Sequence, residues 1–443
     1  MSSSKLLQCK MTFIPDIELE SPERQAEFQL KKLKELVAYL TLHSPFYQKR
    51  NLDADSLTSL KDLEHIATTS KEDIQLYNND FLCVPKSSIV EYTATSGTLG
   101  SPVSIALTQL DLDRLAYNEY LSFELMELNK DDVVQFMLTL DRQFMAGIAY
   151  YLGLQKIGAA GVRTGPGLPS MQLDTMQRLG VTALVAVPSF LIKLIEYAQK
   201  ENIDLSALPI KKVLCIGENI RTETFEMNAL GKYIQAHWHV KLYSTYASNE
   251  MQTGFTECWH GRGGHAHSEL IIVEIIDEEG KQLDAGEYGE VCITTLGVEG
   301  MPLLRYRTGD ICCYDEAPCA CGRTTRRLSP VQGRKKQMIK YKGTTLYPPA
   351  IFELLNQCSF ITEYVLEVKS NEMGMDDLVL HVSTPLVVDD CERKIKPFLQ
   401  SQLRVMPLIN YLSSTEIHAM QFPEGSRKAI KFIDHRKTGL NHE

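Results

Sequence analysis

The stretch on which the fold prediction turns is YTATSGTLGSP at residues 92–102, most of which are Thr, Ser or Gly. Such side chains do not fill a hydrophobic core, but a loop of glycines and hydroxyls can present several N–H and O–H donors to one anion. Apolar residues flank the stretch on both sides, so the expected layout is strand, loop, strand. Because hydroxyl-rich loops are mostly ordinary connections, this stretch alone leaves phosphate binding open.

Composition and charge narrow the class of protein. The chain has 443 residues, 44% hydrophobic and 23% charged, as in a globular protein of two or three domains. There are 46 Lys and Arg against 56 Asp and Glu, and the net charge of −10 disfavours nucleic acid or an anionic membrane as the main partner. We expect no secretory signal and no membrane span. The chain has 11 cysteines, and in the absence of a secretory signal such a number favours a reducing, cytoplasmic location over a disulfide-bonded protein.

The apolar patterns predict a mixed α/β fold. Hydrophobic periodicity indicates helices at 22–42 and 109–128. From 132 to 240, the apolar runs DVVQFMLTL, VTALVAV and KKVLCIG alternate with helical segments, which indicates a parallel sheet flanked by helices. From 268 to 315, β-rich runs separated by turn signals predict antiparallel strands of a distorted barrel.

A new α+β pattern begins near Arg334 and continues to the end of the chain. We therefore expect two domains. They are a large N-terminal domain of helix-flanked sheets with the barrel part, residues 1–333, and a small α+β C-terminal domain, residues 334–443.

Four further motifs follow the hydroxyl-rich loop in order: YSTYASNE (243–250), RYRTGD (305–310), GRKKQMIKYKGTTLYP (333–348) and PEGSRKAIKFID (423–434). With TSGTLGSP, they resemble T-S-G-T-T-G-x-P, Y-G-x-[ST]-E, R-x-R-T-G-D, G-R-x-D-D-M-I-x-x-x-G-x-x-x-x-P and the C-terminal lysine motif of acyl-adenylate-forming enzymes. Four further segments are similar in sequence to one branch of this family, the phenylacetate–coenzyme A ligases: SPFYQKR, TTSKEDI, TTLYPPAIFE and CACGRTTRR. The resemblance covers about residues 22–434, and the order of five motifs makes it specific.

The resemblance implies the adenylate-forming enzyme fold and an AMP-forming acid–thiol ligase. Such enzymes join a carboxylic acid to ATP with Mg²⁺, release pyrophosphate, and pass the acyl group to coenzyme A. The implied acid is aryl or arylacetic, for example phenylacetate. Two alternatives stay open: an adenylating enzyme that hands its acyl group to a carrier protein or an amine, and a catalytically silent nucleotide-binding relative. A homodimer is compatible with the resemblance.

Residue roles carry over by position. Lys428 matches the catalytic lysine that bridges the carboxylate and the α-phosphate, Glu250 matches the Mg²⁺ ligand, and Lys336 stands at the hinge between domains. The sequence departs from the motifs at two places: the loop lysine is missing, and Lys336-Gln337 replaces the hinge Asp pair. Ser248 or Asn249 stands where a hydroxyl residue usually flanks the phosphates in the family. The implied nucleotide-binding residues are Thr95, Ser96, Gly97, Thr98, Gly217, Glu218, Asn219, Tyr246, Ala247, Ser248, Asp310 and Arg334.

The segment at 138–153 matches the acyl-pocket wall of the family, with Phe144, Asp141 and Gly147 as pocket residues. Asp141 and Arg142 replace an apolar or aromatic residue and Gly of the phenylacetate enzymes. A desolvated charge is costly unless it is paired. If the two side chains face the pocket, the acid is polar or differently shaped; if they face solvent, an arylacetate remains favoured.

A separate set of residues has the composition of a metal site. Cys258, His265, Cys319 and Cys321 offer three thiolates and one imidazole, which suits tetrahedral Zn²⁺ in a structural role. Two alternatives remain, because His260 or His267 could replace His265, and the cysteines could be ordinary buried thiols.

Overall fold

The structure is a computed structural model and describes residues 15–95, 103–342, 344–370, 376–403, 405–423 and 429–436. These residues form two compact units. The first unit runs up to Thr308 and also includes Cys312–Pro330, whereas the second contains Gly309–Ile311 and the described chain from Val331 onward. None of the described helices is long and apolar enough to cross a membrane.

A six-stranded sheet in the first unit has the order β4-β3-β5-β6-β7-β8. Its first five strands are parallel, and β8 runs antiparallel to β7. The three apolar runs predicted as strands supply β3, β5 and β6, and all of β5 is buried, as expected for a strand covered on both faces. The strands are β3 (Val133–Phe136), β4 (Ala160–Arg163), β5 (Ala183–Ala186), β6 (Lys212–Cys215), β7 (Lys241–Ser248) and β8 (Thr253–Thr256).

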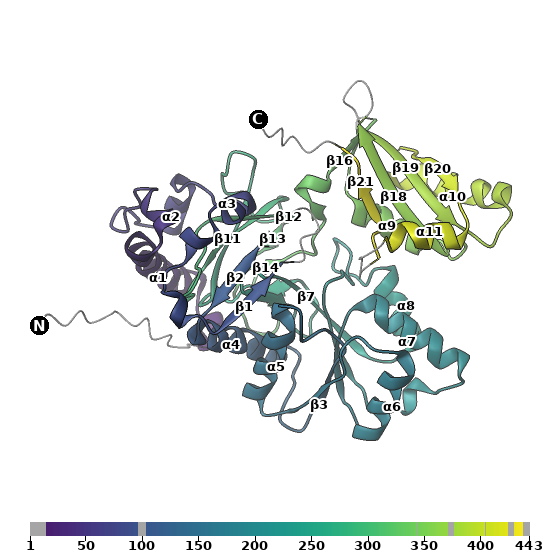
Figure 1. Cartoon of the computed structure of the whole chain (residues 1–443), viewed down its shortest axis with the longest axis horizontal. Coiled ribbons are helices and arrows are strands. Elements are labelled where there is room, and N and C mark those ends of the chain that lie inside the picture. Colours follow the sequence, from purple (N-terminus) through teal and green to yellow (C-terminus); the bar gives the residue numbers. More distant parts are fainter. Residues whose placement is uncertain are drawn as a thin grey trace, which may run out of the picture. The chain divides into compact units, whose positions relative to one another are not determined.

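Helices cover both faces of this sheet (Figure 1). Because neighbouring residues of a strand point to opposite faces, Leu184 of β5 packs in a buried cluster with α6, α7 and α8, while Val185 packs with α4 and α5. The helix predicted at 109–128 is α4, which ends three residues earlier. The bounds are α4 (Gln109–Leu125), α5 (Met145–Ile157), α6 (Pro169–Leu179), α7 (Pro188–Lys200) and α8 (Ala229–His237).

Antiparallel strands and N-terminal helices complete the first unit. A hairpin of β1 (Glu91–Ala94) and β2 (Ser104–Leu107) flanks the hydroxyl-rich loop, as predicted. The antiparallel strands predicted for 268–315 are also present. They and their neighbours are β9 (Gly264–His265), β10 (Ile271–Ile276), β11 (Gly289–Thr295), β12 (Tyr306–Cys312), β13 (Tyr314–Asp315) and β14 (Arg327–Leu328). The Gly309–Ile311 segment of β12 groups with the second unit.

The helix predicted at 22–42 is α1 (Pro22–His43), which begins after the N-cap Ser21. It is followed by α2 (Pro45–Gln48) and α3 (Lys71–Leu76). The 3₁₀ helices are η1 (Pro15–Leu19), η2 (Leu60–His65), η3 (Asn78–Phe81), η4 (Lys86–Ser88), η5 (Leu205–Ala207) and, in the second unit, η6 (Lys335–Gln337).

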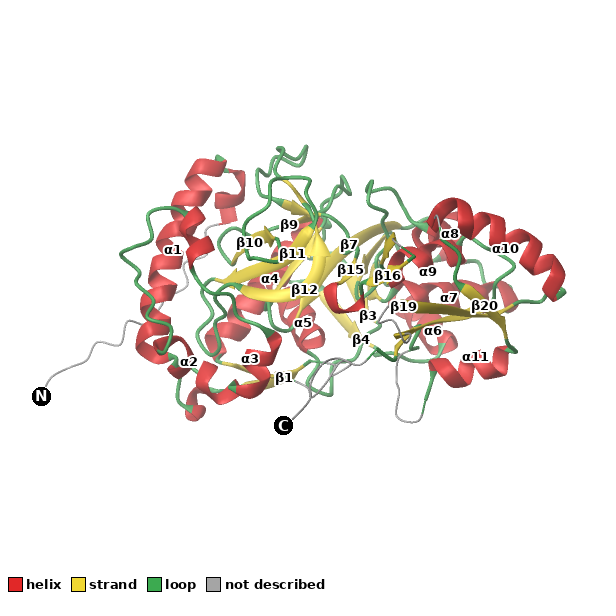
Figure 2. Cartoon of the chain, turned by 90° about the horizontal axis from the view of Figure 1, so that it is seen from above, coloured by secondary structure: helices red, strands yellow, loops and turns green. Residues whose placement is uncertain are grey.

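The second unit is an α+β structure (Figure 2). It is built on a sheet of order β20-β19-β18-β21 (Figure 1). Its core joins Leu366 and Leu380 of the sheet with Ile351 of α9 and Ile395 of α10. The elements are β15 (Gly333–Arg334), β16 (Ile339–Tyr341), β17 (Thr344–Leu346), α9 (Pro348–Asn356), β18 (Glu363–Ser370), β19 (Asp376–Ser383), α10 (Val388–Leu403), β20 (Leu408–Tyr411), α11 (Ser414–Gln421) and β21 (Phe432–Asp434).

Candidate active site and metal centre

The carboxyl ends of the parallel strands collect several predicted nucleotide-binding segments. Gly217, Glu218 and Asn219 follow β6, and Tyr246 to Ser248 close β7, so these segments lie along the same edge of the sheet. The Glu218 carboxylate accepts hydrogen bonds of 2.9 Å from both the backbone N–H and the hydroxyl of Ser189, at the start of α7. Gly217 turns the chain at φ +74°, a conformation that suits glycine. This edge is where α/β sheets commonly bind ligands.

Glu250 lies at the end of this edge and is only 7% exposed. The Nζ of Lys71, on α3, is 3.5 Å from its Oε1. The Tyr306 hydroxyl donates a hydrogen bond of 3.3 Å to the same oxygen. The pair matters because a buried carboxylate requires a cation or hydrogen-bond donors nearby.

Lys71 was not among the predicted site residues, although it stands in TTSKEDI, one of the segments that carries the resemblance. Only an indirect indication in the sequence pointed to Lys71 as part of the site. The hydroxyl-rich loop lacks the lysine that the family often has there, so a cation from another element could have been expected.

The turn after β7 contacts the hairpin that flanks the hydroxyl-rich loop. The Nδ2 of Asn249 donates a hydrogen bond of 2.6 Å to the carbonyl oxygen of Ala94, the last residue of β1. Thr95 closes the hairpin, because its N–H donates to the Val103 carbonyl at 3.0 Å and its hydroxyl accepts from the Val103 N–H at 3.0 Å. Ser96, Gly97 and Thr98 lie outside the described residues.

Tyr246 and Ala247, both predicted to bind the nucleotide, pair with β8 opposite Phe255 and Gly254. The Tyr246 ring stacks on Phe255 with ring centroids 5.8 Å apart. The Ser248 hydroxyl accepts a hydrogen bond of 3.3 Å from the Met251 N–H, which closes the turn that carries Glu250.

The predicted acyl side begins with a tight turn from Asp141 to Phe144, closed by a hydrogen bond of 3.3 Å from the Phe144 N–H to the Asp141 carbonyl. The side chains of Asp141 and Arg142 are 71% and 55% exposed and pair with each other at 3.5 Å. Arg142 and Gln143 both have positive φ, +61° and +58°, and this left-handed conformation costs about 1–2 kcal/mol per non-glycine residue. Of the two orientations left open, the structure has both charges exposed to solvent.

Phe144 and Gly147 lie where this turn enters α5. Phe144 packs against the buried cluster on the α4 and α5 side of the sheet. A Cβ on Gly147 would lie 2.3 Å from the Thr139 carbonyl oxygen, so this glycine allows α5 to approach the segment after β3.

The second unit holds another group of predicted residues. Asp310 of β12 and Arg334 of β15 are opposite each other in register, with Nε 3.3 Å from Oδ1. Lys336 lies in η6, and its carbonyl oxygen accepts a hydrogen bond of 3.2 Å from Arg436. Lys428 lies outside the described residues.

The first arginine of RYRTGD has a structural role. Arg305 donates to both carboxylate oxygens of Glu274 at 3.1 and 2.8 Å, and both side chains are 2% exposed. Burial raises the pKa of Glu274, while the hydrogen bonds from Arg305 act in the opposite direction. The pair connects β10 to the start of β12.

The four predicted metal ligands come together in the first unit. The ligand atoms of Cys258, His265, Cys319 and Cys321 all lie within 4.8 Å of one another. The Sγ atoms of Cys258 and Cys319 are 3.6 Å apart, as are the Cys321 Sγ and the His265 Nε2. A tetrahedron with Zn–S bonds of about 2.3 Å has edges of similar length, about 3.8 Å.

The surroundings of the cluster favour His265 over the alternative histidines. Its Nδ1 is 3.0 Å from the Thr325 hydroxyl, which leaves Nε2 facing the thiols. The Nδ1 of His267 instead contacts Glu18 at 2.5 Å, and His260 is exposed. Burial alone would raise the pKa of Glu18, but His267 and Arg323 hold it below its ordinary value.

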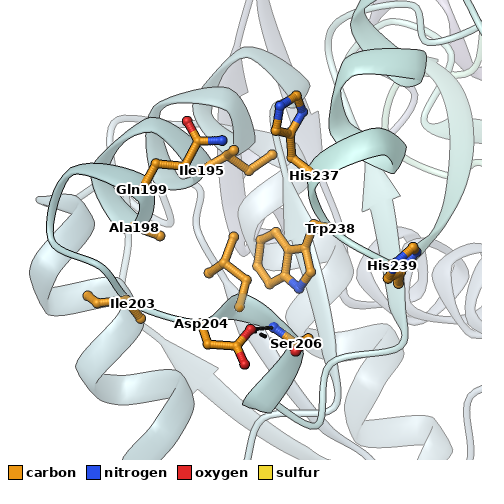
Figure 3. A pocket seen from close by; sticks show the side chains of 10 residues that line it. Ile195, Ala198, Gln199, Ile203, Asp204, Ser206, His237, Trp238 and His239 are labelled. Atoms are coloured by element: carbon orange, nitrogen blue, oxygen red, sulfur yellow. Dashed lines mark hydrogen bonds between the residues drawn. The ribbon is translucent and has the colours of Figure 1, made fainter.

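A cavity of ≈ 270 Å³ lies at the opposite end of the parallel strands, where α7 and α8 end (Figure 3). Ile195, Ala198 and Trp238 form part of its wall, and the exposed side chains of Asp204 and His237 stand at its rim. Its lining includes none of the predicted site residues.

Comparison with known proteins identifies the class. The family model described as "AMP-binding enzyme" matches residues 7–300. The phenylacetate–coenzyme A ligase of Thermus thermophilus is 27% identical to this chain over 382 residues, which cover 84% of each chain. The phenylacetate–coenzyme A ligase of Escherichia coli is 26% identical over 384 residues, which cover 84% of this chain and 85% of the relative. The crystal structure of a 2-hydroxyisobutyryl-CoA ligase in the postadenylation state with 2-HIB-AMP superposes with a TM-score of 0.83 at 21% identity, covering 97% of this chain and 94% of that one.

The fold is therefore that of the adenylate-forming ligases. The chain belongs to the AMP-binding enzyme family. The resemblance and the α/β fold class predicted from the ordered motifs are confirmed, as is the enzyme class, an AMP-forming acid–thiol ligase.

Proposed function

We propose that the protein adenylates an aryl or arylacetic acid, such as phenylacetate, and transfers the acyl group to coenzyme A. In the first step a carboxylate oxygen attacks the α-phosphorus of ATP, and pyrophosphate leaves. In the second step the thiol of coenzyme A attacks the acyl carbon, and AMP and a proton are released. The observation that carries the proposal is the buried carboxylate of Glu250, paired with Lys71 at the ligand-binding edge of the sheet in an AMP-binding enzyme.

The main obstacle in the first step is electrostatic repulsion, because a negatively charged carboxylate must approach a negatively charged polyphosphate. Bound at Glu250, Mg²⁺ would supply positive charge for the phosphates and the leaving pyrophosphate. Lys71 would add a second cation from α3, with three N–H donors, in place of the missing loop lysine. Tyr306 would orient the Glu250 carboxylate through its hydroxyl.

Other roles follow from the motifs. Thr95 to Thr98 would donate to the β- and γ-phosphates, Tyr246 and residues 217–219 would border the adenine, and Asp310 and Arg334 would contact the ribose. The large domain, 1–333, would bind ATP and the acid. The small domain, 334–443, would rotate about Lys336 between the two half-reactions and bring in Lys428 during adenylation.

The exposed pair of Asp141 and Arg142 supports an arylacetate rather than a polar acid. Both side chains already have a charged partner and solvent, so neither needs to line an apolar pocket. Phe144 would then supply the aromatic contact.

A screen of carboxylic acids for pyrophosphate release tests the proposal, with AMP release measured in the presence and absence of coenzyme A. We expect an arylacetate such as phenylacetate to release most pyrophosphate, and coenzyme A to accelerate AMP release. AMP formation that depends on the acid but never responds to coenzyme A would reject the ligase and favour a carrier-protein or amine acceptor.

Lys428→Ala should abolish adenylation in this assay while nucleotide affinity stays within a few-fold, because the lysine acts on the transition state. Lys431→Ala is the matched control, since the Lys431 ammonium donates to the Tyr364 hydroxyl at 3.3 Å within the second unit. An unchanged adenylation rate in the Lys428 variant would refute the role assigned to that lysine.

We further propose that Cys258, His265, Cys319 and Cys321 bind a structural Zn²⁺. Three sulfurs and one imidazole nitrogen at these separations fit the ion, and four protein ligands leave no open position for a substrate. Bound there, the ion would hold the loop at 258–265 to the loop at 319–321.

A further inference from the structure

The main chain of Ala94 is hydrogen-bonded to both the acid-binding side and the nucleotide-binding side of the proposed active site. Its N–H donates a hydrogen bond of 3.0 Å to the carbonyl of Gln143, in the turn that leads to the acyl side. Its carbonyl accepts the hydrogen bond of 2.6 Å from the Nδ2 of Asn249, beside the Glu250 that faces Lys71. One main-chain unit of β1 therefore connects the acid side to the nucleotide side.

The acid side of this connection is a strained turn. Two consecutive non-glycine residues, Arg142 and Gln143, have positive φ. Such conformations persist where the surrounding structure holds them, and they cluster at functional sites. The side chains of Arg142 and Asp141 point into solvent, and the Gln143 carbonyl is fixed on Ala94. The position of the turn, and of Phe144 after it, therefore depends on the position of Ala94.

The nucleotide side of the connection depends on an amide. Asn249 stands in a motif that has Ser or Thr at this place in the resembling family, and a hydroxyl on Cβ is one heavy atom shorter than the Asn amide. The Asn249 amide places its N–H donor on the Ala94 carbonyl while Glu250, the next residue, faces Lys71. The Asn249 amide, which stands in place of the Ser or Thr of the motif, therefore makes a specific hydrogen bond in this chain.

We propose that Asn249 is a positioning residue that couples the binding of the acid to the binding of nucleotide. The proposal rests on the function proposed above. Nucleotide with Mg²⁺ at Glu250 would fix the turn that carries Asn249, and Asn249 fixes Ala94, which fixes the turn at 141–144. An acid bound beside Phe144 fixes the same chain of hydrogen bonds from its other end. Each ligand then tightens the binding of the other by the same factor, as linkage requires.

Calorimetric titration measures this factor directly. The nucleotide is an ATP analogue with a methylene bridge between the α- and β-phosphates, so that adenylation cannot occur, in the presence of Mg²⁺. The acid is whichever of phenylacetate, indole-3-acetate and 2-hydroxyisobutyrate releases most pyrophosphate with the native chain. We expect the acid to bind the native protein at least fivefold more tightly with the analogue present.

Asn249→Ala and Asn249→Ser should both reduce this factor below twofold, with affinity for the analogue alone within threefold of native. In steady-state assays, the KM for the acid at saturating ATP should rise by about 2.5-fold or more, the ratio of the two coupling factors, while kcat falls less than threefold. A residue that only supported the fold would not separate these constants. The Ser variant keeps a polar side chain, and an unchanged melting temperature shows that it is folded.

Asn78→Ala is the matched control. The Asn78 Nδ2 donates a hydrogen bond of 2.9 Å to the carbonyl of Ser104, the residue of β2 opposite Ala94. This variant loses an amide–carbonyl hydrogen bond on the same hairpin without touching Gln143 or Asn249, and it should keep the native coupling factor.

Three results would overturn the inference alone: a native protein that binds the two ligands independently, Asn249 variants that keep the native factor, or an Asn78 variant that loses it equally. A native protein that releases no pyrophosphate with any acid would overturn the proposed function, and the inference with it.

Discussion

At the scale of single residues, Lys71 gives the sharpest test of the active site, because its ammonium faces the buried Glu250 carboxylate from a different element. We expect Lys71→Ala to lower the adenylation rate by about 10²–10³-fold, the size of effect typical for loss of one donor to developing charge. Lys71→Arg keeps the charge and should retain part of the rate. Pyrophosphate release at saturating ATP and acid is the measurement.

Lys49→Ala serves as the control, since Lys49 is an exposed lysine whose Nζ is 3.0 Å from the Asp80 carboxylate. Exposed pairs of this kind contribute little. If Lys71→Ala adenylated as fast as this control, the second cation would have to come from another residue.

Glu119 is a single residue whose charge should control stability against pH. It is buried between α4 and α5, accepts a hydrogen bond of 2.9 Å from Asn118, and its Oε2 has no hydrogen-bond partner within the described chain. Burial raises its pKa to about 8. The folded state therefore holds the proton more tightly than the unfolded state, in which a glutamate titrates at about 4.3.

The stabilising contribution of Glu119 is complete below the unfolded-state pKa and is lost as pH rises through about 8. We expect the free energy of unfolding of the native protein to fall, relative to Glu119→Gln, between about pH 5 and pH 8. Denaturant unfolding at several pH values measures this difference. Parallel pH dependences for the two proteins would show that Glu119 does not carry a raised pKa.

At the scale of elements, the packing of α5 on the segment after β3 depends on Gly147. An added Cβ would lie 2.3 Å from the Thr139 carbonyl oxygen and 2.8 Å from the Leu140 Cα, both backbone atoms. We expect Gly147→Ala to lower the free energy of unfolding by about 1–3 kcal/mol, as overpacking does. Gly254→Ala is the control, because its nearest atom would be at an ordinary 3.4 Å. Equal stability of the two variants would contradict this view of α5.

The two cysteine-bearing loops form a second element-scale feature. Cys321→Ser should leave the purified protein without zinc in elemental analysis, whereas Cys313→Ser, outside the cluster, should keep one equivalent. Ion binding at 1,000-fold excess over Kd stabilises by about 4 kcal/mol, so the Cys321 variant and chelator-treated protein should both melt earlier. Native protein that contains no zinc and does not respond to chelator would remove this site from the proposal.

At the scale of the whole molecule, most of the architecture could be predicted from local patterns. The apolar runs at 132–140, 181–187 and 211–217 mark three buried strands because parallel strands are covered on both faces. The family was recognisable because five short motifs occur in one order. The proposed metal ligands were recognisable because three cysteines and one histidine supply the thiolates and the imidazole that Zn²⁺ prefers, and the structure brings the four side chains together.

Long-range contacts could not be predicted in the same way. Lys71 and Glu250 are far apart in sequence, and no local pattern says that α3 faces the turn after β7. The exposure of Asp141 depends on a backbone turn with two positive φ values, a conformation that Arg and Gln do not favour. The direction of the Asn249 amide depends on the Ala94 carbonyl, which is distant in sequence. Roles assigned to Ser96, Gly97, Thr98 and Lys428, which lie outside the described residues, stay predictions.

The route of the chain through β12 has a practical consequence for dissecting the gene. Gly309–Ile311 group with the second unit, yet Cys312–Pro330 return to the first. A fragment that stops at Pro330 would keep Asp310 and discard its pairing partner Arg334, and a fragment that starts at Val331 would leave β15 without the strand it bonds. Each separately expressed half should therefore expose an unpaired edge strand. Co-expression of fragments that overlap in this region is the better design for complementation.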